Sequence, residues 1–183
     1  MWDRFPDDTM DRLWWINQAL NVHTVASDGP VQVAGLSGLP PQAVMQSNWV
    51  GSTNISYDVS KQQYTLNNGT LLGSHSYYVV LWLFESDSHC NGTGKRVFDV
   101  TINQQLFHRA VDIFKLASSL YKGIEINPNS SIPLGPYMDN IVINATQALS
   151  GSLYSPAIAA VEVLQLFHNH MNDTSPTSAT DGQ

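Results

Sequence analysis

Three aromatic residues and one carboxylate are the strongest candidates for binding chemistry in this sequence. Trp49, Tyr121 and Tyr154 lie near predicted loops and are flanked by Asn, Gly, Ser and Lys residues. A flat aromatic face can stack on the apolar side of a sugar ring, while polar side chains bind the ring hydroxyls. Asp112 is the candidate polar partner, together with Lys122. Partial burial for packing reasons alone is the alternative for each aromatic residue.

Acceptor motifs for N-linked glycans are the second chemical signal. Six N-x-S/T sequons occur, where the composition predicts about two by chance. This density indicates a chain that passes through the secretory pathway, where glycans are attached to surface asparagines. The predicted glycosylation sites are Asn54, Asn68, Asn91, Asn129, Asn144 and Asn172.

Motifs for catalysis and metal binding are incomplete. Residues 7–11 match D-D-x-x-D, which holds magnesium and diphosphate in terpene synthases, but that chemistry needs a deep helical barrel. Residues 92–95 resemble the end of a phosphate loop but lack its first glycine and its final Ser or Thr. His168 and His170 form the only close histidine pair, with no third ligand nearby. The sequence also contains no G-x-S-x-G turn. We therefore expect no enzyme, no metal and no cofactor.

Charge and cysteine content exclude several partners. The 183-residue chain has a formal net charge of -7 and only eight Lys and Arg residues. Such a chain lacks the basic surface that a phosphate backbone requires, so we expect no nucleic-acid partner. Cys90 is the only cysteine, which excludes an internal disulfide.

The elements that must position these residues are predicted to be short strands. Residues 77–84 are apolar at every position, as expected of a strand in the middle of a sandwich. Residues 96–102 alternate, with Phe98, Val100 and Ile102 on one face. About eight strands separated by turn residues predict an all-β fold, a two-sheet antiparallel β-sandwich of jelly-roll type. The candidate strands are 43–47, 55–59, 77–84, 96–102, 110–114, 123–126, 138–145 and 158–166.

The chain divides into three predicted parts. Residues 1–30 form an acidic, Trp-rich entry linker docked on the domain, residues 31–170 form the sandwich, and residues 171–183 form a disordered tail. The first residues do not resemble a signal peptide, although the sequons predict secretion. We reconcile the two by expecting the chain to be a fragment whose export signal precedes Met1.

Four strings, in order along the chain, resemble the malectin-like domain of plant receptor-like kinases and leucine-rich-repeat receptor-like proteins. The first covers residues 5–14, which resemble a Pro-Asp-Asp-x-x-Asp-Arg-x-Trp segment that opens the second module of a tandem. Residues 41–47 resemble Pro-x-x-Val-x-Gln-Thr. Residues 77–85 and 96–103 resemble a Tyr-Tyr-Val-Val-Leu-His-Phe-Ala-Glu strand followed by Arg-x-Phe-Asp-Val-x-Ile-Asn. Residues 156–163 resemble the closing Pro-Ile-Leu-Asn-x-Ile-Glu-Val strand.

The resemblance implies a non-catalytic ligand-binding module at the extracellular face of the plasma membrane. It implies cell-wall carbohydrate as the ligand, with a secreted peptide as the alternative. It also implies a sister malectin module or a co-receptor as possible protein partners. The animal malectin that binds a glucose disaccharide carries an aromatic pair where this chain has residues 86–88, Ser-Asp-Ser. A shallow aromatic groove would favour carbohydrate, whereas a large apolar patch around Trp14 and Trp15 would favour a purely structural module.

Overall fold

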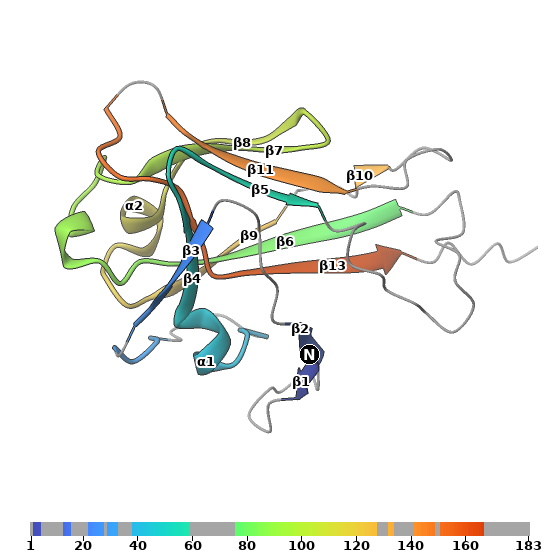
Figure 1. Cartoon of the computed structure of the whole chain (residues 1–183), viewed down its shortest axis with the longest axis horizontal. Coiled ribbons are helices and arrows are strands. Elements are labelled where there is room, and N and C mark those ends of the chain that lie inside the picture. Colours follow the sequence, from blue (N-terminus) through green and yellow to red (C-terminus); the bar gives the residue numbers. More distant parts are fainter. Residues whose placement is uncertain are drawn as a thin grey trace, which may run out of the picture.

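The protein is an antiparallel all-β structure, which confirms the predicted fold class (Figure 1). One sheet has the order β5-β11-β7-β8, and a second has the order β10-β6-β13, with β9 also paired to β6. A three-stranded sheet, β12-β4-β3, and the β1-β2 pair complete the described strands. The computed structural model describes residues 2–4, 13–15, 22–27, 29–32, 38–58, 76–127, 132–133, 141–148 and 151–166.

The bounds of the elements follow the chain. The strands are β1 (Trp2–Arg4), β2 (Leu13–Trp15), β3 (Val22–Ala26), β4 (Ser47–Gly51), β5 (Asn54–Asp58), β6 (Ser76–Phe84), β7 (Val97–Ile102), β8 (Gln105–Asp112), β9 (Gly123–Ile126), β10 (Ile132–Pro133), β11 (Val142–Gln147), β12 (Ala157–Ile158) and β13 (Ala160–Leu166). The helices are α1 (Gln42–Met45), the 3₁₀ turn η2 (Ser88–Cys90) and α2 (Ile113–Ala117).

Strand β6 is buried on both faces, as its unbroken apolar sequence predicts. Val79, Leu81 and Leu83 pack into the main core between the sheets. The alternate residues Trp82 and Phe84 pack into a second apolar cluster on the other face, which also contains Met45 of α1. Because the pleat sends successive side chains to opposite faces, one strand supplies both clusters.

Strand β7 follows the predicted alternation. Phe98, Val100 and Ile102 are buried in the main core, while Val97, Asp99 and Thr101 are partly exposed on the outer face. Strand β11 lies between β5 and β7, so it is a central strand of this sheet. The same sheet ends at β8, which pairs on one side with β7.

Two predicted strands are helical over part of their length. The strand predicted over 43–47 is wrong, because residues 42–45 form α1 and β4 starts at Ser47. The N–H groups of Val44 and Met45 donate to the carbonyl of Pro41, which closes the first turn. The strand predicted over 110–114 ends at Asp112, whose Oδ1 accepts the N–H of Lys115 and so caps α2.

Other boundaries shift modestly. The closing strand predicted over 158–166 is split into β12 and β13 at Ala159, whose N–H donates to the carbonyl of Trp82. β3 lies within the segment predicted as an entry linker and pairs with β4 over five residues. The predicted tail of residues 171–183 lies outside the described residues.

The role of β6 as the shared layer is testable by truncation. Leu81→Ala removes a fully buried side chain from the main core, so we expect the free energy of unfolding to fall by about 2–5 kcal/mol. The matched control is Leu164→Ala on the neighbouring strand β13, where the side chain is 45% exposed and the expected change is below about 1 kcal/mol. Urea unfolding of both variants measures the difference. Equal losses would contradict the assignment of Leu81 to the core.

Candidate functional site

A buried ion pair lies at the end of β6. Arg96 Nε donates to Glu85 Oε2 at 2.7 Å, and the two side chains are 6% and 3% exposed. Arg96 Nη1 also donates to the carbonyl of Ser155, and Glu85 Oε1 accepts the N–H of Asp87 at 3.1 Å. Burial alone would lower the pKa of Arg96, but the Glu85 carboxylate outweighs it and leaves the pKa raised. The Arg96 guanidinium therefore stays charged, and the pair joins three segments of the chain.

The only cysteine lies against this ion pair. Arg96 Nη2 is 3.4 Å from Cys90 Sγ, and the thiol is buried. Burial, followed by the nearby Glu85 carboxylate, raises the pKa of Cys90 to about 12. The residue is thus a protonated, unreactive thiol at neutral pH. Its role is packing around the ion pair rather than chemistry.

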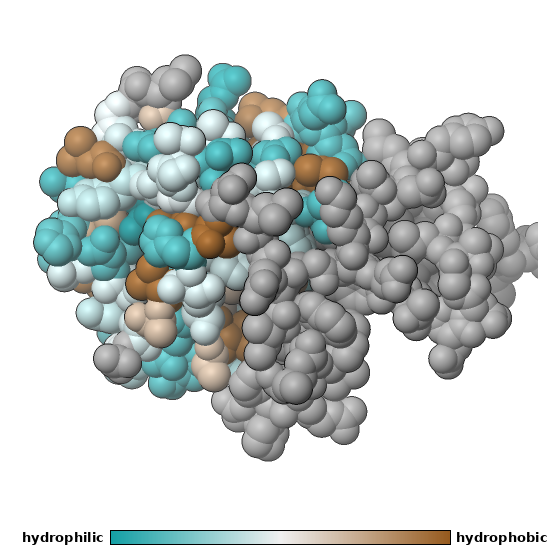
Figure 2. Space-filling model, in the orientation of Figure 1, coloured by the Kyte–Doolittle hydropathy of each residue, from teal (hydrophilic) through white to brown (hydrophobic). Residues whose placement is uncertain are grey.

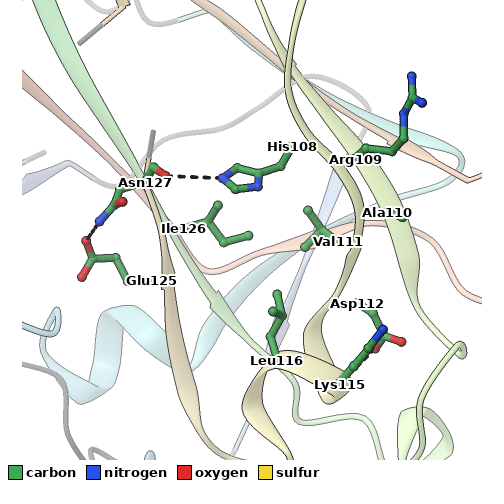
Figure 3. A pocket seen from close by; sticks show the side chains of 10 residues that line it. All are labelled: His108, Arg109, Ala110, Val111, Asp112, Lys115, Leu116, Glu125, Ile126 and Asn127. Carbon is green, nitrogen blue, oxygen red and sulfur yellow. Dashed lines mark hydrogen bonds between the residues drawn. The ribbon is translucent and has the colours of Figure 1, made fainter. Parts of the chain in front are cut away.

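A pocket of about 310 Å³ lies between the edge strands of the two main sheets (Figure 3). We call it the seam pocket. Its floor is formed by the buried residues Val111 of β8 and Ile126 of β9. His108 closes one end, with Nε2 3.4 Å from the carbonyl of Asn127, and Leu116 of α2 lies toward the other end. The full lining is His108, Arg109, Ala110, Val111, Asp112, Lys115, Leu116, Glu125, Ile126 and Asn127.

An irregularity in β8 shapes the rim of this pocket. The pairing of β7 with β8 shifts register between Phe98 and Val100, and Ala110 has a φ of 51°. A non-glycine residue in that region is strained, and here Asp99 Oδ1 accepts the Ala110 N–H at 2.7 Å. Such a bulge bends and twists a strand locally, and here it lies at Ala110 in the lining of the pocket.

The carboxylates around the seam pocket accept hydrogen bonds from the protein, whereas two cationic side chains have no such partner among the described residues. Asp112 accepts the N–H groups of Gly94 (2.6 Å) and Lys115, and Glu125 accepts from the Asn127 side chain. By contrast, the guanidinium of Arg109 and the ammonium of Lys115 have no hydrogen-bond or ion-pair partner within the described parts of the chain. Figure 3 shows Arg109 reaching outward from the rim. The pocket therefore offers free cationic donors, while both oxygens of Asp112 and Oε1 of Glu125 already accept hydrogen bonds.

The structure places the predicted aromatic residues apart from one another. Trp49 is half-buried in β4 and packs on Tyr57, with ring centroids 5.1 Å apart. Tyr121 packs against Phe84 at 6.3 Å in the second apolar cluster. Tyr154 is half-buried, with its ring 6.0 Å from the Arg96 guanidinium. Each ring thus has a packing partner of its own.

Asp112, the predicted polar partner, lines the seam pocket but is only 5% exposed. Both of its carboxylate oxygens accept backbone N–H groups. The pocket residues His108, Arg109 and Lys115 were not predicted from the sequence. Their types and spacing carry no motif, and only the pairing of β8, α2 and β9 brings them together.

We find no second cluster of candidate site residues, such as a set of metal ligands, in the described part of the chain. Figure 2 shows hydrophobic residues scattered among hydrophilic ones on the coloured part of the molecule. Within the described residues no group of three His, Cys, Asp or Glu side chains could hold a metal, and no helix is long and apolar enough to cross a membrane. The His168–His170 pair and the side chains of Trp14 and Trp15 lie outside what the structure describes.

The contribution of the Glu85–Arg96 ion pair to stability can be tested by removing the cation. Arg96→Met leaves the Glu85 carboxylate buried without a cation, so we expect a loss of about 3–5 kcal/mol in unfolding free energy. We also expect Cys90 to react with a thiol reagent at pH 8 at least about tenfold faster, as its shielding is lost.

Urea unfolding and thiol labelling measure the two effects. Lys95→Met, which changes the neighbouring, partly exposed residue, is the matched control, with an expected change within about 0.5 kcal/mol. An Arg96→Met variant as stable as its parent would contradict the role of the pair.

Comparisons with known proteins agree with this architecture. The extracellular domain of ANXUR1 from Arabidopsis thaliana superposes with a TM-score of 0.70 at 11% identity, covering 88% of this chain and 44% of that one. The ANX2 ectodomain from the same plant gives 0.70 at 12% identity, covering 89% and 46%. FER, in a complex with the plant peptide RALF23 and LLG2, gives 0.64 at 14% identity, covering 87% and 44%.

The chain thus spans less than half the length of these ectodomain structures. No curated protein sequence matches it. The sequence profile of the malectin-like domain matches residues 2–166, nearly the whole chain. This protein belongs to the malectin-like domain family.

Proposed function

We propose that the chain is a non-catalytic ligand-binding module from the extracellular part of a plant receptor-like protein, and that its ligand docks in the seam pocket. The pocket is the observation that carries the proposal. Its volume of about 310 Å³ lies at the lower end of the range of ligand sites. It combines an apolar floor with polar and charged side chains at its rim, which can orient a ligand.

A peptide is the ligand class that the surroundings favour. A structural neighbour, FER, is found with the peptide RALF23 and with LLG2. The pocket also lies beside β8, an edge strand, and edge strands accept extended peptides through backbone hydrogen bonds. For this chain we propose a secreted peptide as ligand, with a co-receptor or a second malectin module as partner.

Cell-wall carbohydrate is the second candidate, and one observation favours it. Tyr154 is half-buried over Arg96, and its neighbour Leu153 is 66% exposed. A partly exposed tyrosine ring can stack on a sugar. Trp49 and Tyr121 remain proposed ligand contacts, but we rank them below Tyr154 because each already packs on another aromatic ring.

Secretion is part of this proposal, and three sequons can be placed. Asn54, at the start of β5, and Asn91, after η2, are exposed. Asn144 is half-buried in β11, between β5 and β7. Asn68, Asn129 and Asn172 lie outside the described residues. Because β5 and β8 are opposite edges of one sheet, a glycan on Asn54 leaves the seam pocket open.

We predict that Asn54 and Asn91 carry glycans in chain secreted from plant cells and that Asn144 does not. Enzymatic glycan removal in heavy-oxygen water, followed by peptide mass spectrometry, marks each site that was modified. Asn54→Gln and Asn91→Gln should each remove one glycan from the intact mass. Unmodified Asn54 and Asn91 in secreted protein would contradict the proposed exposure of these sites to the glycosylation machinery.

The site of binding is tested by filling the pocket. Leu116→Trp adds bulk at the rim of the seam pocket, and Leu153→Trp adds the same bulk beside Tyr154; both leucines are more than half exposed. We would titrate glucan, cellulose and pectin oligomers and synthetic RALF23 peptide by calorimetry. We expect saturable binding of a probe that weakens at least about tenfold in Leu116→Trp and less than about twofold in Leu153→Trp.

The opposite pattern would move the site to Tyr154 and support the carbohydrate candidate. No saturable binding of any probe to folded chain would overturn the proposed function.

A further inference from the structure

We infer that the seam pocket binds a carboxylate on an extended peptide segment that lies along the outer edge of β8. The inference rests on the proposed function and names the ligand chemistry of that same pocket. Three independent features support it. Cationic side chains at the rim have no hydrogen-bond partner in the described structure, the pocket has no aromatic ring for stacking, and the outer edge of β8 is open.

The charge pattern selects an anion. Two carboxylates line the pocket, but those of Asp112 and Glu125 already accept hydrogen bonds from the protein. Arg109 and Lys115 are exposed, and neither side chain has a partner in the described part of the chain. The two cations match the two carboxylates of the lining in number, so an anion gains from the unused donors of Arg109 and Lys115 and not from a net positive charge. A carboxylate is the group that matches unpaired guanidinium and ammonium donors.

The wall chemistry favours a peptide side chain over a neutral sugar. None of the ten lining residues is Phe, Tyr or Trp, so the pocket has no flat ring of the kind on which sugars stack. Its floor, formed by Val111 and Ile126, is aliphatic, and so is the rim residue Leu116. The methylene groups of a Glu or Asp side chain fit such a floor. Lys115 is the cationic side chain at the α2 end, beside Asp112 (Figure 3).

The edge of β8 supplies the remaining contacts. β8 is the last strand in the order β5-β11-β7-β8, so in the described structure its outer backbone groups pair with no further strand. An added strand can use these groups where the edge is regular, on either side of the bulge at Ala110. His108, joined to Asn127, holds the two edge strands together at one end of the pocket. Exposed Leu106 extends the apolar contact along β8 beyond that end.

The experiment is a titration of the isotope-labelled full chain, followed by backbone NMR shifts. The probe is an acetylated hexapeptide of alternating glutamate and valine. The same peptide with glutamine for glutamate tests charge, and a galacturonic acid hexamer tests whether a uronate chain supplies the carboxylate instead. We expect saturable shifts in residues 106–116 and 123–127 with the glutamate peptide, and at least about tenfold weaker binding of the other two probes.

Charge-removing variants locate the contact. Lys115→Gln should weaken binding of the glutamate peptide about tenfold and Arg109→Gln about threefold to tenfold, because each removes a charge-assisted donor. Lys95→Gln, outside the pocket lining, is the matched control and should change affinity less than about twofold. All three residues are partly or fully exposed, so we expect the variants to fold as the parent does.

Several outcomes would overturn the inference while leaving the proposed function standing. Equal binding of the glutamine peptide, a preference for the uronate hexamer, or shifts centred on residues 152–155 would each do so. So would unchanged affinity in Lys115→Gln. Absence of binding by these probes, together with pocket-dependent binding of RALF23 or an oligosaccharide, would remove the carboxylate assignment alone.

Discussion

The buried ion pair of Glu85 and Arg96 is the constraint on which the arrangement of this end of the molecule depends. Glu85 follows the last residue of β6, and Arg96 precedes the first residue of β7. Arg96 also binds the carbonyl of Ser155, just before β12. One guanidinium therefore links the end of a strand in one sheet, the start of a strand in the other, and the segment before β12. A hydrophobic pair could fill the space, but only a donor with several fixed N–H groups can satisfy partners in three segments at once.

The same strand that carries this pair also fixes the layers. Because β6 is apolar on both faces, it must be covered twice, once by the opposing sheet and once by the segment that contains Val31 and Met45. Glycine at position 123 fits this second layer, since a Cβ there would lie 2.9 Å from Leu39 and 3.1 Å from Met45. The outer layer therefore packs tightly on β6 and β9.

How far the sequence predicted this structure depends on the distance over which each signal acts. The burial of β6 and the alternation of β7 are local patterns, and both were correct. Helix α1 was missed because four residues are too few to show helical periodicity, and α2 because its cap, Asp112, reads equally well as a strand residue.

The site was harder to predict, because an aromatic residue near a predicted loop can serve packing as well as ligand binding. Trp49 and Tyr121 were chosen as aromatic residues near loops, but the fold uses both to pack on other rings. Arg109 and Lys115 lie six positions apart and belong to different elements, with a bulge at Ala110 between them. No short-range pattern predicts a pocket that arises from a register shift and from the meeting of two sheet edges.

The net charge of -7 bears on how a pocket with two free cationic side chains would bind an anion in this chain. At long range the chain repels an acidic ligand, so general electrostatic attraction cannot supply affinity. At physiological salt the Debye length is about 8 Å, so this repulsion is largely screened, while direct contacts to Lys115 and Arg109 persist. A carboxylate therefore gains from the pocket only after it has arrived there. Such a site discriminates by local geometry and depends little on the overall charge of its partner.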